Sequence, residues 1–123
     1  MGKAFSSTHQ FQTNIATATS AVGTPLNVQG YSVVGFQIIG LNTGTVQWEG
    51  NITSGESVGS TTTWVAIRAT SLNSGTAATT ASADGIFQLD CRGLVAVRAR
   101  VTTLSFVNNG RLDVYGYAQA ETT

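Results

Sequence analysis

The chain has 123 residues, which predicts a single domain. Six basic and six acidic side chains give a formal net charge of zero, and only 10% of the residues are charged, so the composition does not favour nucleic acid as a partner. One cysteine and one histidine do not make a typical zinc site or an internal disulfide, and no apolar run reaches the ~20 residues of a membrane span. We therefore expect a binding or structural protein without catalytic residues, metal or cofactor, and not an enzyme.

Residues 1–23 are rich in Ala, Thr and Ser, with isolated Phe5, Phe11 and Ile15. Their alternation is weak, which predicts an extended N-terminal arm or an edge strand rather than part of the core. No apolar stretch typical of a secretory signal follows Met1, so we expect synthesis in the cytoplasm. We assign residues 1–23 to the arm and residues 24–123 to one folded domain.

From residue 24 onward, apolar side chains recur at every second position between clusters of Gly, Asn, Ser and Asp, which is typical of an all-β domain. Residues 31–41 are apolar at alternating positions on both faces, so we expect a strand that is central or covered by a second layer. In residues 45–52, Val46, Trp48 and Ile52 are predicted to point inward. The next strand, in residues 63–69, places Val65 and Ile67 inward and Trp64 opposite to them.

Residues 70–84 contain few large apolar side chains, which predicts a long surface loop. Three further strands then alternate well, in residues 86–91, 94–103 and 111–120. We expect inward side chains at the positions Phe87, Leu89, Cys91, Val95, Val97, Ala99, Val101, Leu112, Val114 and Ala118. The last two strands are predicted to pair as a hairpin, which would bring Arg98 or Arg100 within reach of Asp113 on the outer face.

About seven or eight short strands without helices predict a two-layer antiparallel β-sandwich, jelly-roll-like, or a small barrel. Cys91 shares a face with Phe87 and Leu89, so we interpret it as a buried structural thiol. Trp64 is either a core residue or an exposed aromatic side chain for sugar stacking or partner contact. Arg98 and Arg100 are either a solvated strand face or a site for an acidic partner.

Four segments resemble a pattern found in small virion proteins of tailed bacteriophages: GTVQWEGNI (44–52), TTTWVAIRA (61–69), SADGIFQLDCRGLVAVRARVT (82–102) and GRLDVYGYA (110–118). The most specific part is Gly93-Leu94 followed by the alternating segment 97–101. The loop after Ile52 departs from the pattern, because Glu56 is its only charged residue where an acidic glycine-containing turn is expected. The resemblance implies a structural role in the virion, similar to capsid decoration (cement) proteins or to tail and fibre β-sandwich modules.

We therefore expect a decoration protein, made in the bacterial cytoplasm, that binds the major capsid protein on the capsid surface and forms a homo-oligomer, in particular a trimer. Neither nucleic acid nor a membrane is an expected partner. Phe5, His9 and Phe11 are the expected arm contacts. Trp64, Arg98 and Arg100 are the candidates for the body interface. The alternative is a tail, baseplate or fibre module that binds host sugar through Trp64.

Overall fold

The computed structural model describes residues 8–15, 23–41, 43–52, 64–105 and 112–120, and all regular elements in this part of the chain are β-strands. They form two antiparallel sheets. Sheet A runs in the order β1 (His9–Ile15), β11 (Leu112–Gln119), β3 (Val33–Ile39), β9 (Gly85–Asp90), β6 (Ala69–Ser71) and β7 (Ala77–Ala78). Sheet B runs in the order β2 (Leu26–Asn27), β10 (Ala96–Ser105), β4 (Thr43–Asn51) and β5 (Val65–Ala66), with β8 (Thr80–Ala81) also paired to β4.

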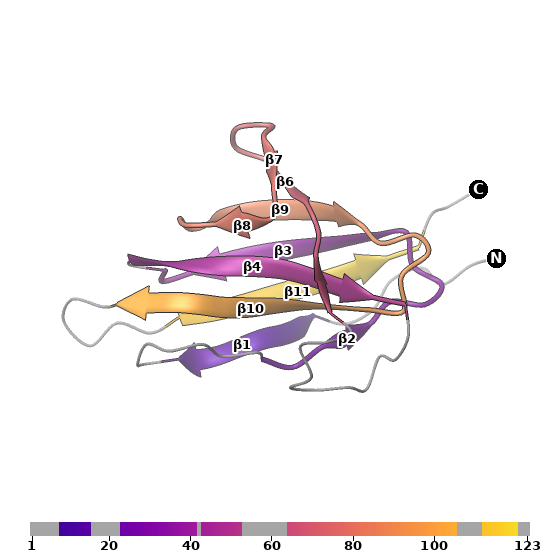
Figure 1. Cartoon of the computed structure of the whole chain (residues 1–123), viewed down its shortest axis with the longest axis horizontal. Helices are drawn as coiled ribbons and strands as arrows, with labels where there is room; N and C mark the ends of the chain where they lie inside the picture. Colours follow the sequence, from indigo (N-terminus) through magenta and orange to yellow (C-terminus); the bar gives the residue numbers. More distant parts are fainter. Residues whose placement is uncertain (1–7, 16–22, 42, 53–63, 106–111, 121–123) are drawn as a thin grey trace.

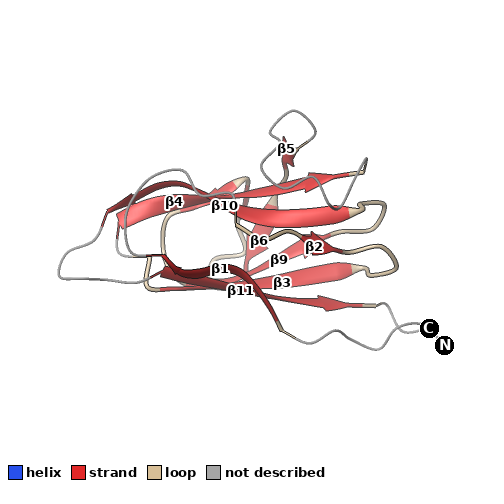
Figure 2. Cartoon of the chain, turned by 90° about the horizontal axis from the view of Figure 1, so that it is seen from below, coloured by secondary structure: helices blue, strands red, loops and turns tan. Residues whose placement is uncertain are grey.

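The two sheets pack face to face as separate layers (Figures 1 and 2). Successive long strands alternate between them, since β3 lies in sheet A, β4 in sheet B, β9 in sheet A, β10 in sheet B and β11 in sheet A. The orders β1-β11-β3-β9 and β2-β10-β4-β5 are those of a jelly roll. The predicted all-β, two-layer, jelly-roll-like sandwich is therefore confirmed.

The core lies between the sheets and is built from the inward side chains of their long strands. Trp48 of β4 stacks on Phe36 of β3 with ring centroids 4.4 Å apart, and Phe87 of β9 lies 5.1 Å from the same indole ring. The expected inward positions of β10 and β11 are confirmed at Val97, Ala99, Val101, Leu112, Val114 and Ala118, all fully buried. β3 is central in sheet A, as its two apolar faces predict.

The first strand confirms the edge-strand alternative for residues 9–15, although Phe11 and Gln12 are buried. Residues 9–15 form β1, the edge strand of sheet A, paired with β11 of the same chain. Phe11 belongs to the core cluster, and the Gln12 side chain is buried and donates a hydrogen bond from Nε2 to the carbonyl of Ala99 at 2.8 Å. Because Ala99 lies in β10, Gln12 joins the two sheets at this edge. Residues 9–15 are thus part of the sandwich, where they pair with a strand of their own chain.

The predicted hairpin of the last two strands is wrong. β10 pairs with β4 in sheet B, whereas β11 pairs with β1 and β3 in sheet A. Asp113 accepts a hydrogen bond from Gln10 Nε2 at 3.1 Å, and the two arginines of β10 face Glu49 instead. β10 lies in sheet B and β11 in sheet A, so these two strands follow each other in the sequence but do not pair.

Two smaller expectations also change. The predicted surface loop 70–84 contains β7, β8 and most of β6, which pair with β6, β4 and β9, respectively. Ile52 and Val65, predicted to point inward, are exposed by 66% and 63%. Ile52 follows the last residue of β4, and Val65 lies in the two-residue strand β5. Asp84 accepts backbone hydrogen bonds from Gly40 and Leu41 and so supports the β3–β4 connection.

Candidate functional site

The outer face of sheet B carries a cluster of charged side chains centred on Glu49. Arg98 lies opposite Glu49 in the β10–β4 ladder and donates from Nε to Glu49 Oε1 at 2.6 Å. Gln47 Nε2 donates to the other carboxylate oxygen at 2.7 Å, and Arg100 Nη1 lies 3.5 Å from it. Arg98 is 1% exposed and Glu49 3% exposed, so this ion pair is buried although it lies on the outer side of its sheet.

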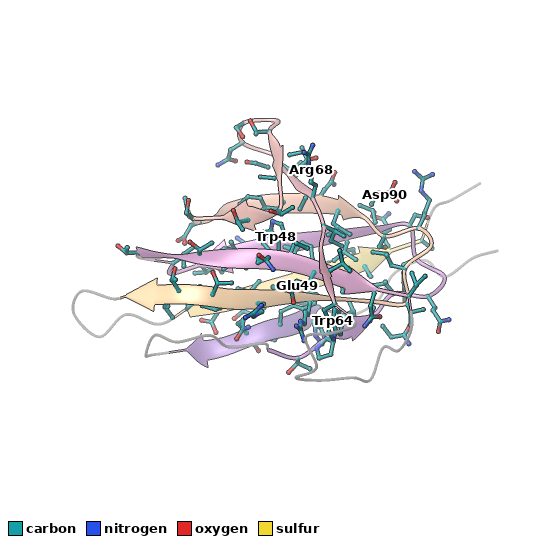
Figure 3. All side chains as sticks on the ribbon, viewed as in Figure 1. Trp48, Glu49, Trp64, Arg68 and Asp90 are labelled. Atoms are coloured by element: carbon teal, nitrogen blue, oxygen red, sulfur yellow. The ribbon has the colours of Figure 1, made fainter. Side chains whose placement is uncertain are left out.

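Trp64 packs on this cluster of charged side chains. It directly precedes β5, which pairs with β4 at Glu49 and Gly50, and the Arg98 guanidinium lies 4.4 Å from the centroid of its ring. Figure 3 shows Trp64 close to Glu49 on this side of the sandwich. Trp64 is only 6% exposed, so its ring is occupied by its own chain. The burial of Trp64 agrees with its interpretation as a core residue and not as an exposed aromatic side chain. The burial of Arg98 corrects its assignment to the body interface.

The remaining candidates are placed as follows. Phe5 lies outside the described residues. Phe11 is buried with its ring 5.0 Å from Phe36, which corrects its assignment as an arm contact. His9 is half-buried, packs edge-on against Phe11 and donates from Nε2 to the Thr24 carbonyl at 2.9 Å. Of the described candidates, only His9 and Arg100 retain some accessible surface.

Cys91 follows β9 and is fully buried, as the alternation predicts. Burial raises the pKa of its thiol from 9.0 to about 11, and the neighbouring Asp90 carboxylate adds to the rise. The thiolate is the reactive form of cysteine, so this environment suppresses nucleophilic chemistry. Within the described residues, no group of three His, Cys, Asp or Glu side chains is placed to hold a metal ion, and no helix is long and apolar enough to cross a membrane.

The outer face of sheet A has the opposite character. Two rows run across its strands, Tyr115–Gln37–Ile86 and Tyr117–Gly35–Gln88, and Ile39 lies beside them on β3. Ile39, Ile86 and Tyr117 are 44%, 45% and 41% exposed. We call the side chains of Gln37, Ile39, Ile86, Gln88, Tyr115 and Tyr117 the tyrosine face. It combines apolar and carboxamide groups without a charge, and it is the accessible surface that sequence reasoning missed.

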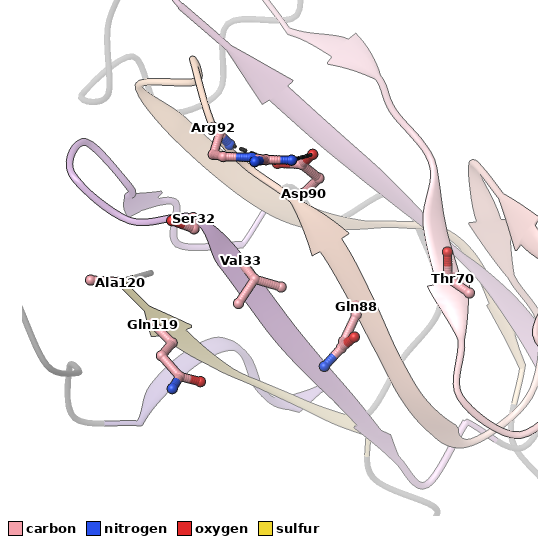
Figure 4. A pocket seen from close by; sticks show the side chains of 8 residues that line it. All are labelled: Ser32, Val33, Thr70, Gln88, Asp90, Arg92, Gln119 and Ala120. Carbon is pink, nitrogen blue, oxygen red and sulfur yellow. Dashed lines mark hydrogen bonds and ion pairs between the residues drawn. The ribbon is translucent and has the colours of Figure 1, made fainter. Parts of the chain in front are cut away.

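Two depressions lie on the outer side of sheet A. The larger, about 650 Å³, is lined by Ser32, Val33, Thr70, Gln88, Asp90, Arg92, Gln119 and Ala120 (Figure 4). Arg92 Nη2 lies 2.8 Å from Asp90 Oδ2 at its rim. The smaller, about 260 Å³, lies over Gly35 and is lined by Thr8, Gly35, Phe36, Gln37, Ile86, Tyr115, Gly116 and Tyr117. Gln88 lies in the Gly35 row and lines the larger depression, so the two adjoin.

A sequence signal for this face was present, since Tyr115 and Tyr117 alternate with buried residues and β3 is apolar on both faces. The second apolar face of β3 predicts a strand that is central or covered by a second layer. In the structure that layer covers only the inner face, so the outer apolar groups stay accessible.

The fold is shared with two solved structures. The SPBc2 prophage-derived protein YomS is similar over 91% of this chain and 90% of its own, with a TM-score of 0.74 and 15% sequence identity. The PBSX exported protein XepA is similar over 90% of this chain and 36% of its own, with a TM-score of 0.75 and 20% identity. No protein-family model matches the sequence, and no curated protein matches it. At these identities the likeness establishes the common fold.

Proposed function

We propose that this chain is a structural protein of a bacteriophage particle that acts by binding other subunits, and that it decorates the capsid by attaching to the major capsid protein. The tyrosine face carries this proposal. Its exposed groups Ile39, Ile86 and Tyr117 lie on three adjacent strands, and none of these three side chains carries a charge. Surfaces of this kind mark sites of protein association.

Two further observations support a phage origin. Segments 44–52, 61–69, 82–102 and 110–118 resemble small virion proteins of tailed phages. The solved structures YomS and XepA, which share the fold, are described as prophage-derived and as an exported PBSX protein. We propose that the chain forms a homotrimer on the capsid surface. In a closed symmetric assembly every subunit makes the same contacts with its neighbours.

Binding to undecorated phage heads tests the proposal. The purified chain should co-sediment with heads that lack it, and imaging should place it on the capsid shell. Ile86→Lys introduces a charge into the tyrosine face and should abolish this binding. Val65→Lys is the matched control, because Val65 is also an exposed apolar side chain but lies in β5 of sheet B. No binding of the wild type would reject the capsid role, and equal binding of wild type and Ile86→Lys would reject the tyrosine face as the binding surface.

A tail, baseplate or fibre module is the second candidate. The similarity to XepA supports this candidate. It covers 36% of the longer XepA chain, so the same fold also occurs as a module within a larger protein. Particles lacking the chain provide the test, since added protein would bind to tails and leave empty heads undecorated.

A further inference from the structure

The smaller depression on sheet A owes its shape to Gly35. This glycine lies between Tyr117 of β11 and Gln88 of β9, so its row lacks a side chain at the centre of the sheet. A Cβ atom placed there would meet nothing closer than the Tyr117 carbonyl oxygen at 3.9 Å. The space above Gly35 is therefore open, and its position in an extended strand accepts any side chain. The hollow exists because the residue at its floor is glycine.

The walls of this hollow combine two kinds of chemical group. Tyr115, Tyr117 and Ile86 offer flat or apolar surfaces, and both tyrosines also carry a hydroxyl group. Gln37 contributes a carboxamide that donates and accepts hydrogen bonds. None of the eight lining residues carries a charge or an imidazole. Such a lining offers no charged partner to a phosphate, a carboxylate or an ammonium group.

We propose that the hollow over Gly35 is a subsite for one neutral pyranose ring of an oligosaccharide. The C–H face of a pyranose packs on tyrosine rings, while its hydroxyl pairs suit a carboxamide with both a donor and an acceptor. At about 260 Å³ the hollow lies just below the range of drug-sized pockets, which fits a single ring. This site is distinct from Trp64, whose ring packs on Arg98.

The adjoining larger depression extends the site along the sheet. Its lining includes Gln88, Gln119 and Ser32, which are hydrogen-bonding side chains, together with the ion pair of Asp90 and Arg92. A chain of sugars that begins over Gly35 would pass Gln88 and meet these groups. We therefore expect an oligosaccharide to bind more tightly than a monosaccharide.

Nuclear magnetic resonance titration of the full chain tests this inference, with cellotetraose, maltotetraose and chitotetraose as probes. At least one probe should shift the amide signals around Gly35 and Tyr117, with a Kd on the order of 1 mM. Gly35→Val fills the hollow with a side chain suited to a strand, and should weaken binding at least about tenfold. Glucose 6-phosphate should bind no better than glucose.

The controls separate this inference from the proposed function. Val65→Lys changes the other side of the molecule and should keep the wild-type affinity for the sugar. Val65→Lys should also still bind phage heads, whereas Ile86→Lys changes the tyrosine face and should lose both activities. Absence of binding by all three tetrasaccharides, or equal affinity of wild type and Gly35→Val, would overturn the saccharide subsite without affecting the capsid proposal.

Discussion

The outer faces of the two sheets contrast in both composition and exposure. On sheet B the outward groups Glu49 and Arg98 are charged and buried, with Trp64 packed on the arginine. On sheet A the outward groups Ile86 and Tyr117 carry no charge and are exposed. This arrangement is the reverse of what polarity alone predicts, because exposure depends on which segments cross a face as well as on its side chains.

The contrast shows where function and stability reside in this sandwich. A buried ion pair is strongly destabilising when only one partner is removed, since the other charge stays without compensation in a poorly solvated site. Exposed apolar groups contribute little to the stability of the isolated chain and remain free to contact a partner. We therefore expect the loss of one charge in the Glu49 cluster to lower stability, and we propose that recognition involves the tyrosine face.

The largest effect is expected for the buried ion pair. Glu49→Ala leaves the Arg98 guanidinium buried without its carboxylate and should lower the free energy of unfolding by about 3–5 kcal/mol. Urea denaturation measures this change. Asp90→Ala breaks the exposed ion pair with Arg92 and should cost at most about 1 kcal/mol. Equal losses in the two variants would contradict the assignment of Glu49 to a buried cluster.

The next prediction concerns the thiol of Cys91, one residue from an exposed carboxylate. Because burial raises its pKa to about 11, the thiolate fraction at pH 8 should be roughly a hundredfold lower than for a thiol of pKa 9.0. The rate of alkylation by iodoacetamide, followed by mass spectrometry, should be correspondingly slow in the native protein. Addition of urea should restore fast alkylation, and equally fast labelling before unfolding would refute the predicted environment.

The two faces of sheet A differ at a pair of glycines. A Cβ at Gly116 would overlap the ring of Phe11 in the core, so Gly116→Ala should destabilise the protein by about 1–3 kcal/mol. Gly35→Ala on the outer face meets open space and should be neutral or stabilising, by up to about 1 kcal/mol, since glycine is unfavourable within a strand. Thermal unfolding compares the two, and a stable Gly116→Ala variant would mean that Phe11 is not packed under β11.

The smallest effect is expected from Asp90. A hydrogen bond from the Arg92 side chain, aided by the Arg92 backbone, lowers the pKa of this carboxyl group from 3.8 to about 2. A depressed pKa stabilises the folded state above the unfolded value, and this contribution disappears as the pH falls from about 4 through 2. Both side chains are more than 60% exposed, so solvent screening keeps the contribution small.

Titration of the Asp90 carboxyl carbon by nuclear magnetic resonance measures this pKa directly. Arg92→Ala should return the pKa toward 3.8, while Glu49→Gln, far from this rim, should leave it unchanged. A depressed pKa that persists in Arg92→Ala would show that Arg92 is not its cause.

The sequence predicted which side chains of a strand point inward better than it predicted which strands pair. Alternation in β10 and β11 correctly separated Val97 and Val114 from the outward groups, because the pleat places every second residue on one side. Pairing was mispredicted where consecutive strands cross between layers, since short connections usually join neighbours in one sheet. Strand phase alone also did not show that Trp64 packs on Arg98, because a tertiary contact buries both.

For the candidate site, the sequence indicated which side chains share a face but not which face stays accessible. The alternation that places Val114 and Ala118 inward leaves Tyr115 and Tyr117 on the outer face. Arg98 and Trp64 are the predicted interface residues because arginine and tryptophan are common at interfaces. The hollow over Gly35 depends on registers between three strands distant in the sequence. Such registers have no local sequence signal.

The place of β11 in sheet A affects how the chain acquires its structure during synthesis. This last strand lies between β1 and β3, so the earliest strand of the sheet has no neighbour until residues 112–119 have left the ribosome. Translation proceeds at about 5–20 residues per second, and sandwich topologies with distant pairings fold slowly. The backbone edges of β1 and β3 that pair with β11 therefore remain without this partner for seconds in the nascent chain. Overproduction in bacteria should accordingly benefit from lower temperature and from chaperones that shield nascent apolar segments.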